Sequence, residues 1–205
     1  IATNWSYRDI AYSRGKMAKD RVFVVRSGPN LKRMRIQPPV ESWKKGRRFL
    51  VGYVGVMGAQ EGIPYLLEAA RRIIRDLKRE DVQCVLVGGG SDLEQVKQQA
   101  VDMGLADYVT FTGRAPDQVM LDVLNTADVC VNPDEANVMN DKSTMNKIIE
   151  YMALGKPVVQ FDLTEGRFSA QEASLYARHN DTADMADKIV ELLDDPERRA
   201  RMGAF

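Results

Sequence analysis

The stretch FLVGYVGVMGAQEGIPYLLEAARRII, residues 49–74, decides the fold class of this chain. It opens with an almost continuous apolar run, passes through a glycine-rich loop, and ends with apolar residues at helical spacing. Such a run predicts a buried strand, and the segment after the loop predicts an amphipathic helix. Residues 49–74 therefore form the first strand–loop–helix unit of an α/β domain.

The same rhythm continues along the rest of the chain. Further strands are predicted at 82–90, 108–113, 128–133, 156–162 and 173–179, and further helices at 91–104, 116–127, 144–154, 182–195 and 196–203. The helix at 91–104 is predicted to have Ser91 as its N-cap. Nearly continuous apolar strands that alternate with helices indicate a parallel sheet covered on both faces. Right-handed crossovers then make this an α/β fold with a doubly wound, Rossmann-like parallel sheet.

The first 48 residues differ from the rest in charge. They hold 13 Lys or Arg and 3 Asp or Glu, whereas residues 49–205 hold 16 and 26. The pattern predicts a short helix with Ser6 as N-cap, a strand at 21–25 and a basic linker at 31–48. We expect residues 1–48 to connect a Rossmann-like domain at 49–205 to a further, N-terminal domain, and the last helix to be cut short. A binder of RNA or anionic lipid is the other interpretation of a basic arm.

The overall composition is typical of a soluble globular protein. The chain has 205 residues, 44% hydrophobic and 28% charged, and no apolar run approaches the roughly 20 residues of a membrane span. Cys84 and Cys130 lie in apolar, strand-like runs and are predicted to be buried free thiols. With a single histidine, His179, in a predicted loop, we expect no metal site.

The ligands of a doubly wound sheet bind beyond the carboxyl ends of its strands, so the loops that follow the strands are the candidate sites. The first of these loops has glycines at positions 55, 58 and 62. This spacing matches neither the G-x-G-x-x-G of dinucleotide-binding dehydrogenases nor a P-loop. Gly55 and Gly58 are candidates for close approach of a ligand, although glycines also serve ordinary turns.

The stretch NDKSTMNKIIEYMALGKPVV, residues 140–159, contains a predicted helix with two interpretations. In the structural one, Ser143 or Thr144 caps the helix and Lys147 pairs with Glu150 three residues later. The core face then consists of Met145, Ile148, Ile149 and Met152.

In the other interpretation, the start of this helix binds an anion. Free N–H groups and the positive end of the helix dipole would hold a diphosphate, and Lys142 would add a charge. A ribose would then lie one or two turns along the helix, where Glu150 could accept hydrogen bonds from its hydroxyls. Spacing alone leaves both interpretations open.

Several motifs in order point to one family. The series GYVGVMGAQEGIPYLLEAA, VLVGGGSDLEQV, VTFTGRAPD, TADVCVNPD, EYMALGKPVV and DDPERRARMG resembles the C-terminal, donor-binding domain of retaining glycosyltransferases of family 4 (group 1), which have the GT-B fold. The resemblance covers about residues 49–205, and EYMALGKPVV is its most specific part. It implies transfer of a sugar from a nucleotide-diphosphate donor with retention of configuration, without a bound metal or cofactor.

The resemblance also implies partners and a location. The partners would be the nucleotide sugar, an acceptor that is a saccharide or a lipid-linked glycan, and the N-terminal domain of the same chain. Nucleic acid is not expected as a partner. We expect a cytoplasmic protein that acts in polysaccharide synthesis and meets the inner face of a membrane through the other domain.

By the same resemblance, Glu150 holds the ribose, the amides before it hold phosphate, and the base lies near residues 112–114. The candidate donor-binding residues are Gly55, Gly58, Gly113, Arg114, Lys142, Ser143, Thr144, Lys147 and Glu150. No catalytic side chain is identified.

The chain departs from the family at three charged positions. The Arg and Lys of the first glycine loop fall at Val56 and Glu61, and the glutamate eight residues before Glu150 falls at Lys142. Lys142, Lys147, Arg114 and Arg167 are hypothetical substitutes as phosphate partners. These departures also favour an alternative function, a non-catalytic nucleotide-sugar-binding or scaffold domain.

Overall fold

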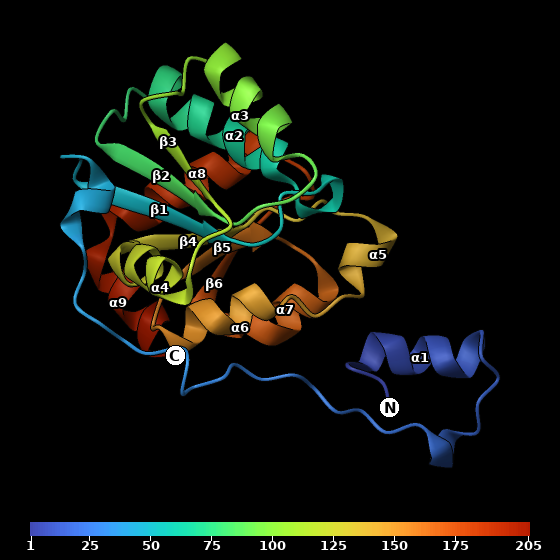
Figure 1. Cartoon of the computed structure of the whole chain (residues 1–205). Coiled ribbons are helices and arrows are strands. Elements are labelled where there is room, and N and C mark those ends of the chain that lie inside the picture. Colours follow the sequence, from blue (N-terminus) through green and yellow to red (C-terminus); the bar gives the residue numbers. More distant parts are fainter.

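A six-stranded parallel sheet forms the centre of the computed structural model, which describes all 205 residues (Figure 1). The strands are β1 (Phe49–Val54), β2 (Val82–Val87), β3 (Val109–Gly113), β4 (Val129–Asn132), β5 (Val158–Phe161) and β6 (Ser174–Ala177). They lie in the order β3-β2-β1-β4-β5-β6, so the winding direction changes between β1 and β4. The predicted doubly wound parallel sheet is confirmed, and the loops after β1 and β4 flank its switch point.

Helices cover both faces of the sheet. The helices are α1 (Trp5–Ser13), α2 (Ile63–Arg71), α3 (Leu93–Asp102), α4 (Asp117–Thr126), α5 (Val138–Asp141), α6 (Asn146–Ala153), α7 (Thr164–Ala170), α8 (Thr182–Asp194) and α9 (Pro196–Ala204). Side chains of α2, α3 and α8 join a core of 30 buried residues, and those of α4 and α6 join a core of 13 on the opposite face. Alternate residues of β1 supply both cores: Phe49 and Val51 point into the first, and Leu50 into the second.

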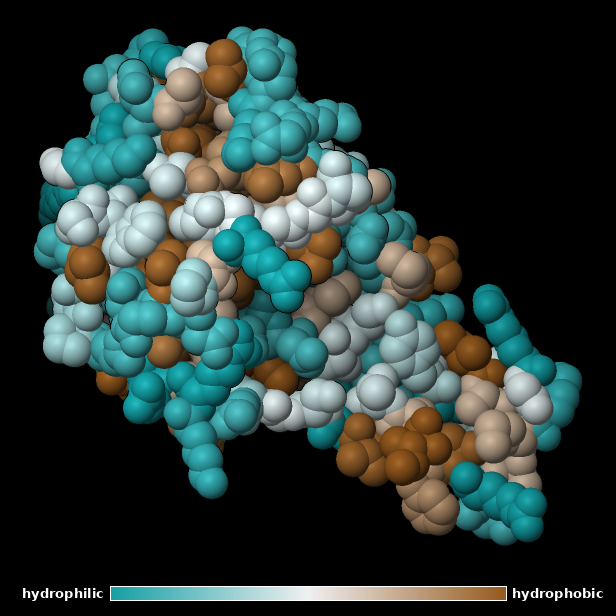
Figure 2. Space-filling view, viewed as in Figure 1, coloured by the Kyte–Doolittle hydropathy of each residue, from teal (hydrophilic) through white to brown (hydrophobic).

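Residues 1–48 are here called the arm; its first part, with α1, lies outside the sheet domain (Figure 1), whereas Met34 is buried in the core of 13 residues. The predicted strand at 21–25 is wrong, because this segment forms a single parallel bridge, between Ala2 and Val24. The β-branched run therefore lacks a neighbouring strand long enough to form a ladder. Apolar side chains gather on the arm's surface (Figure 2), and Phe23, at 65% exposed, is one of them.

Three predicted helix caps are also wrong. The N-cap of α1 is Asn4, whose side chain accepts a hydrogen bond from the Tyr7 N–H, while Ser6 lies inside the helix. Helix α3 begins at Leu93 without a side-chain cap from Ser91. Helix α6 begins at Asn146, likewise without one, after the unpredicted short helix α5.

Gly62, in the loop after β1, packs against the loop after β4. Its replacement tests how tightly these two loops pack. Gly62 has φ +66°, and an added Cβ would overlap the carbonyl oxygen of Pro133. We expect Gly62→Ala to lower the free energy of unfolding by roughly 3–4 kcal/mol, as strain and a backbone clash add. Urea unfolding measures the loss. Gly46→Ala is the control, because Gly46 has φ +79° with no atom within 4 Å, and it should cost about 1–2 kcal/mol. Equal losses would contradict the packing described here.

Candidate functional site

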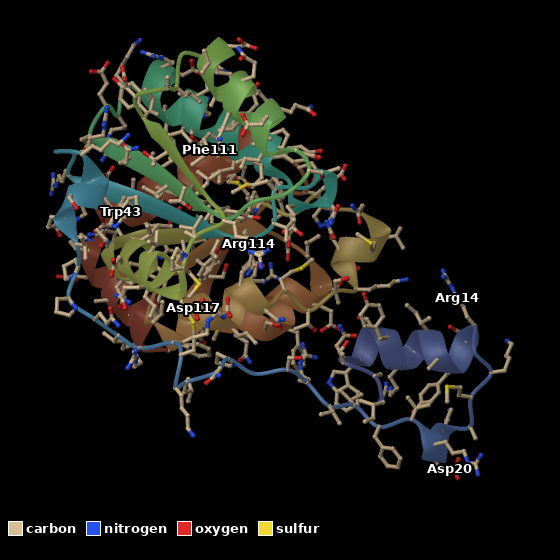
Figure 3. All side chains as sticks on the ribbon, in the orientation of Figure 1. Arg14, Asp20, Trp43, Phe111, Arg114 and Asp117 are labelled. Carbon is tan, nitrogen blue, oxygen red and sulfur yellow. The ribbon has the colours of Figure 1, made fainter.

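A hollow of about 460 Å³ lies at the carboxyl ends of β1, β2 and β3. Its lining consists of Gly55, Val56, Gly89, Gly90 and Arg114. Two predicted site residues, Gly55 and Arg114, thus lie together, and Gly113 directly precedes Arg114 at the end of β3. Arg114 and Asp117, at the start of α4, are found at this same end of the sheet (Figure 3).

Two glycines in or next to this hollow are required by packing between loops. An added Cβ at Gly88 would overlap the Gly55 carbonyl oxygen, and one at Gly90 would overlap that of Met57. Gly58 has more room, since the nearest atom to an added Cβ is a side-chain atom 3.6 Å away. Glycine at 88 and 90 therefore has a structural reason, and Gly58 leaves free space at the crevice.

The start of α6 leaves four successive backbone N–H groups, those of residues 144–147, without an acceptor in the protein. The prediction that Ser143 or Thr144 caps the helix is wrong. The Ser143 hydroxyl donates to the carbonyl of Met139 at 2.8 Å, and the Thr144 hydroxyl accepts from the Asn4 side-chain amide at 3.0 Å. Unpaired N–H groups at a helix start are donors for an anion.

Lys147 points into the protein and binds two carboxylates. Its Nζ lies 2.6 Å from Oε2 of Glu61 and 2.7 Å from Oδ1 of Asp134, and 5.1 Å from the centre of the Tyr53 ring. The predicted pair with Glu150 is therefore wrong. The predicted core face is wrong in part: Lys147, Ile148 and Tyr151 are the buried residues of α6, whereas Met145 and Met152 are half-buried.

The ion cluster of Lys147, Glu61 and Asp134 carries one more negative than positive charge. Burial raises the pKa of Asp134 above its ordinary value, although Lys147 acts in the opposite direction. Burial likewise raises the pKa of Tyr53, next to Glu61. Oδ2 of Asp134 and the side-chain amide of Asn132 have no hydrogen-bond partner. The cluster is thus strongly buried and incompletely satisfied.

Glu150 lies half-buried on the side of α6 that faces the arm. Its Oε1 is 3.5 Å from Nη1 of Arg33, and Arg33 also makes two bonds to Asp117, at 2.7 and 2.8 Å. Burial raises the pKa of Glu150 while Arg33 opposes the shift. The pKa of Asp117 is lowered by its hydrogen bonds to Arg33. One oxygen of Glu150 has no protein partner and could accept from a ligand hydroxyl.

The three positions that depart from the family have distinct surroundings. Val56 is exposed at the rim of the hollow, and Glu61 is held by Lys147. The side chain of Lys142 lines a different hollow, of about 310 Å³, against α1. Arg167, a suggested phosphate partner, instead pairs with Asp162 through two bonds of 2.7 Å.

Sequence reasoning missed the partners that reach the site from far along the chain. Asn4, Arg33 and Asp134 are 140, 117 and 13 residues from the groups of α6 or its entrance that they contact. For Asp134 a signal existed, because it follows a predicted strand in the loop at the sheet's carboxyl edge. For Asn4 and Arg33 no local pattern marks a contact with this edge.

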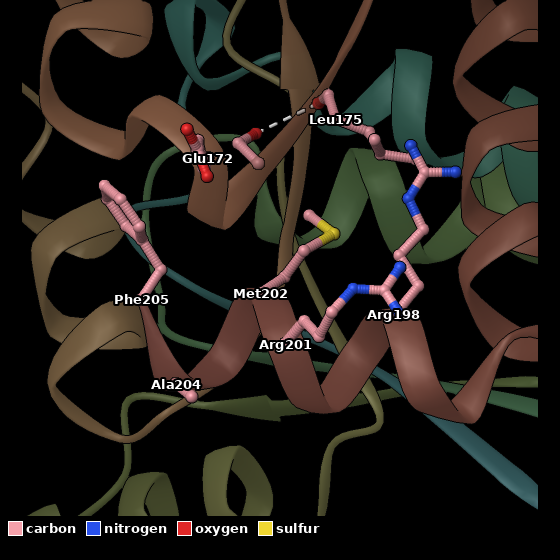
Figure 4. A pocket seen from close by; sticks show the side chains of 8 residues that line it. Glu172, Leu175, Arg198, Arg201, Met202, Ala204 and Phe205 are labelled. Carbon is pink, nitrogen blue, oxygen red and sulfur yellow. Dashed lines mark hydrogen bonds between the residues drawn. The ribbon is translucent and has the colours of Figure 1, made fainter.

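A larger hollow, of about 640 Å³, lies between β6 and α9, away from the predicted residues (Figure 4). Arg198, Arg201 and Phe205 line it from the last helix, and Glu172 faces them. None of the predicted donor-binding residues contributes to its lining. It follows β6 rather than the switch point of the sheet, so it is not the candidate site.

Neither a membrane span nor a metal-binding cluster of acidic, His or Cys side chains occurs. Every helix is too short or too polar to cross a bilayer. No three His, Cys, Asp or Glu side chains lie together so as to hold a metal ion. His179 is exposed in a loop and contacts the carbonyl of Asp162, and Cys84 and Cys130 are free and buried, as predicted.

Residues 48–195 match the family described as "Glycosyl transferases group 1". The chain belongs to that family. The match covers the whole sheet and its helices as far as α8, and the sequence resemblance that indicated group 1 is confirmed.

The curated relatives that this chain matches are longer proteins. An alpha-D-kanosaminyltransferase of Streptomyces kanamyceticus is 29% identical over 157 residues, 76% of this chain and 39% of that protein. A D-inositol 3-phosphate glycosyltransferase of Nocardia farcinica is 28% identical over 196 residues, 90% of this chain and 42% of that protein. The chain thus spans about two fifths of the length of these relatives.

Solved structures agree with the fold. Anabaena HepE in complex with UDP and glucose superposes with a TM-score of 0.80 at 17% identity, over 99% of this chain and 55% of that one. Staphylococcus aureus TarM, in complex with UDP and other ligands, gives 0.77 at 18% identity, over 99% and 38%. These likenesses show that the domain has the Rossmann-like α/β fold found in GT-B glycosyltransferases.

Removal of the buried ammonium tests the ion cluster. In Lys147→Met, Glu61 and Asp134 lose their shared cation, and we expect a loss of roughly 3–5 kcal/mol in the free energy of unfolding near neutral pH. The pKa of Asp134, already raised by burial, should rise further. The folded state then binds a proton that the unfolded state lacks, so the deficit should shrink as the pH falls from about 7 to about 5.

Lys142→Met is the matched control, because Lys142 forms no ion pair and lies half-exposed. Urea unfolding of both variants at both pH values measures the difference. A loss for Lys147→Met that equals the control's, or that does not depend on pH, would contradict the described cluster.

Proposed function

We propose that this chain is the donor-binding part of a glycosyltransferase and binds a nucleotide-diphosphate sugar beside the switch point of its sheet. The observation that carries the proposal is the free N–H groups of residues 144–147, with Glu150 on the second turn of the same helix. An anion at the helix start would find the N–H groups as donors. A hydroxyl-bearing group one turn further along would find Glu150 as an acceptor.

Each part of the donor has a candidate contact. The diphosphate would accept from the amides of residues 144–147, with positive charge nearby from Arg114 or Lys142. The ribose hydroxyls would donate to the free oxygen of Glu150. The base would lie near residues 112–114, where Gly113 has φ +68° and no atom within 4 Å of an added Cβ.

The reaction would replace one bond at the anomeric carbon by another with retention of configuration. The bond to the diphosphate oxygen breaks, the bond to an acceptor hydroxyl oxygen forms, and the hydroxyl proton passes to the departing diphosphate. The helix amides would stabilise the charge on the departing diphosphate, with no bound metal or other cofactor needed. UDP in the complexes of HepE and TarM supports a nucleotide donor.

The acceptor, a saccharide or a lipid-linked glycan, would bind to an N-terminal domain of the same chain. We therefore expect this chain alone to bind donor and to turn over little. We propose a cytoplasmic protein that acts in polysaccharide synthesis and meets the membrane through that other domain.

The contacts of the arm favour a connector over a nucleic-acid binder. Arg26 pairs with Glu165 at 2.8 Å and Arg33 with Asp117, so these basic side chains face the domain. Arginine side chains that are paired with carboxylates of the protein are not free to bind the phosphates of RNA.

A scaffold domain that binds nucleotide sugar without transfer is the second candidate. Glu61 favours this candidate, because it occupies the position at which the resemblance implies a phosphate-binding Lys. Glu61 also forms an ion pair with Lys147. Together with Val56 at the other basic position, it leaves the first glycine loop without a cation.

Calorimetric titration with UDP, GDP, ADP and dTDP tests the proposal. We expect one of them to bind and Glu150→Ala to weaken it by about 10- to 150-fold, the cost of losing about 1.5–3 kcal/mol of charge-assisted hydrogen bonds. Glu172→Ala, in the hollow beside α9, is the control and should bind normally. Absence of binding to all four, or equal affinity of Glu150→Ala, would refute the donor site.

A further inference from the structure

The arm holds the backbone that leads into α6. The Asn4 side-chain amide donates to the carbonyl of Lys142 at 2.9 Å and to the Thr144 hydroxyl at 3.0 Å. The Tyr7 hydroxyl lies 2.7 Å from the Ser143 hydroxyl. Each residue of the segment 142–144 is thus contacted by a side chain from the arm, at the point where the free N–H groups of residues 144–147 begin.

The two Asn4 contacts are partly buried and are anchored by further bonds. Asn4 is completely buried, and its remaining oxygen accepts from the N–H of Tyr7, which fixes the amide's orientation. Glu165, on α7 and 3% exposed, accepts from the Ser6 hydroxyl at 2.7 Å and from Arg26 at 2.8 Å. The arm is therefore held against α7 by a carboxylate that has partners on both oxygens.

A further contact, within the domain, joins α5 to α7. Oδ1 of Asp141, at the end of α5, accepts from the Thr164 N–H at the start of α7, at 2.8 Å. Segment 142–144 is thus held by the arm, follows a residue bonded to α7, and leads into the free N–H groups at the start of α6. A shift of the arm would change the direction of the N–H groups that follow.

We infer that Asn4 is a positioning residue, which aims the free N–H groups of residues 144–147 at the diphosphate of the donor, with Glu165 holding it in place. This inference rests on the proposed function. Affinity for the diphosphate then depends on the docked arm, and the bound diphosphate strengthens docking by the same factor. Because the arm connects to the rest of a longer protein, donor binding would be coupled to the placement of the acceptor-binding part.

The variant Asn4→Ser tests this inference. Serine still caps α1 but is too short to reach Lys142 and Thr144. We expect the nucleoside diphosphate that binds the unaltered protein to bind roughly three- to tenfold more weakly, as neutral hydrogen bonds that orient its donors are lost. The matching nucleoside, which lacks phosphate, should bind unchanged. Tyr12→Phe, which loses a bond within the arm, should leave both affinities unchanged.

The ratio of the two affinities separates positioning from a general loss of structure. If diphosphate and nucleoside weaken equally, or if neither weakens, the inference is overturned while the donor site stands. If none of the four diphosphates binds the unaltered protein, the proposed function and this inference fail together. Should Asn4→Ser not fold, Tyr7→Phe decides: it removes the exposed bond to Ser143, and it should weaken the diphosphate about two- to threefold and leave the nucleoside alone.

Discussion

The structure around the candidate site depends on one buried ammonium, that of Lys147. It joins three segments at the switch point of the sheet: the loop after β1 through Glu61, the loop after β4 through Asp134, and α6 itself. A charge this deeply buried requires partners, so the helix is rotated to bring Lys147 inward. With Lys147, Ile148 and Tyr151 buried on one side of α6, Glu150 faces Arg33 and the crevice.

The same cluster keeps a positive charge near the first glycine loop, although the loop itself has lost the cation that the resemblance implies. Where the resemblance implies a cation in the first glycine loop, this chain has Glu61, and a cation from α6 lies 2.6 Å from it. The exchange is incomplete, because Asp134 adds a second carboxylate. A net negative cluster weakens a nearby diphosphate site, and uptake of a proton by Asp134, whose pKa is raised, would offset that effect.

The sequence predicted the fold well because the sheet is governed by local periodicity. The apolar runs from Phe49 and Val82 are buried on both faces, so their hydrophobicity is continuous and their boundaries are clear. The amphipathic pattern of this helix predicts Lys147 outside the core face, because such patterns place charges toward solvent. That rule is overridden here by carboxylates 86 and 13 residues away in the chain, which no local pattern reveals.

The candidate site was predicted in part for the same reason. Gly55 and Arg114 lie at the carboxyl edge of the sheet because topology alone puts them there. The caps at Ser143 and Thr144 were predicted from local preference, yet both hydroxyls are engaged by tertiary contacts with the arm. The strand at 21–25 failed because β-branched residues need a neighbouring strand, and a single bridge to Ala2 is what the arm supplies.

The central claim is that the free amides at the start of α6 bind the diphosphate, and amide NMR during titration tests it most directly. Addition of the nucleoside diphosphate that binds should shift the N–H resonances of residues 144–147, whereas the corresponding nucleoside should leave them in place. If the diphosphate binds and these four resonances do not move while others do, the donor site lies elsewhere and the account is contradicted.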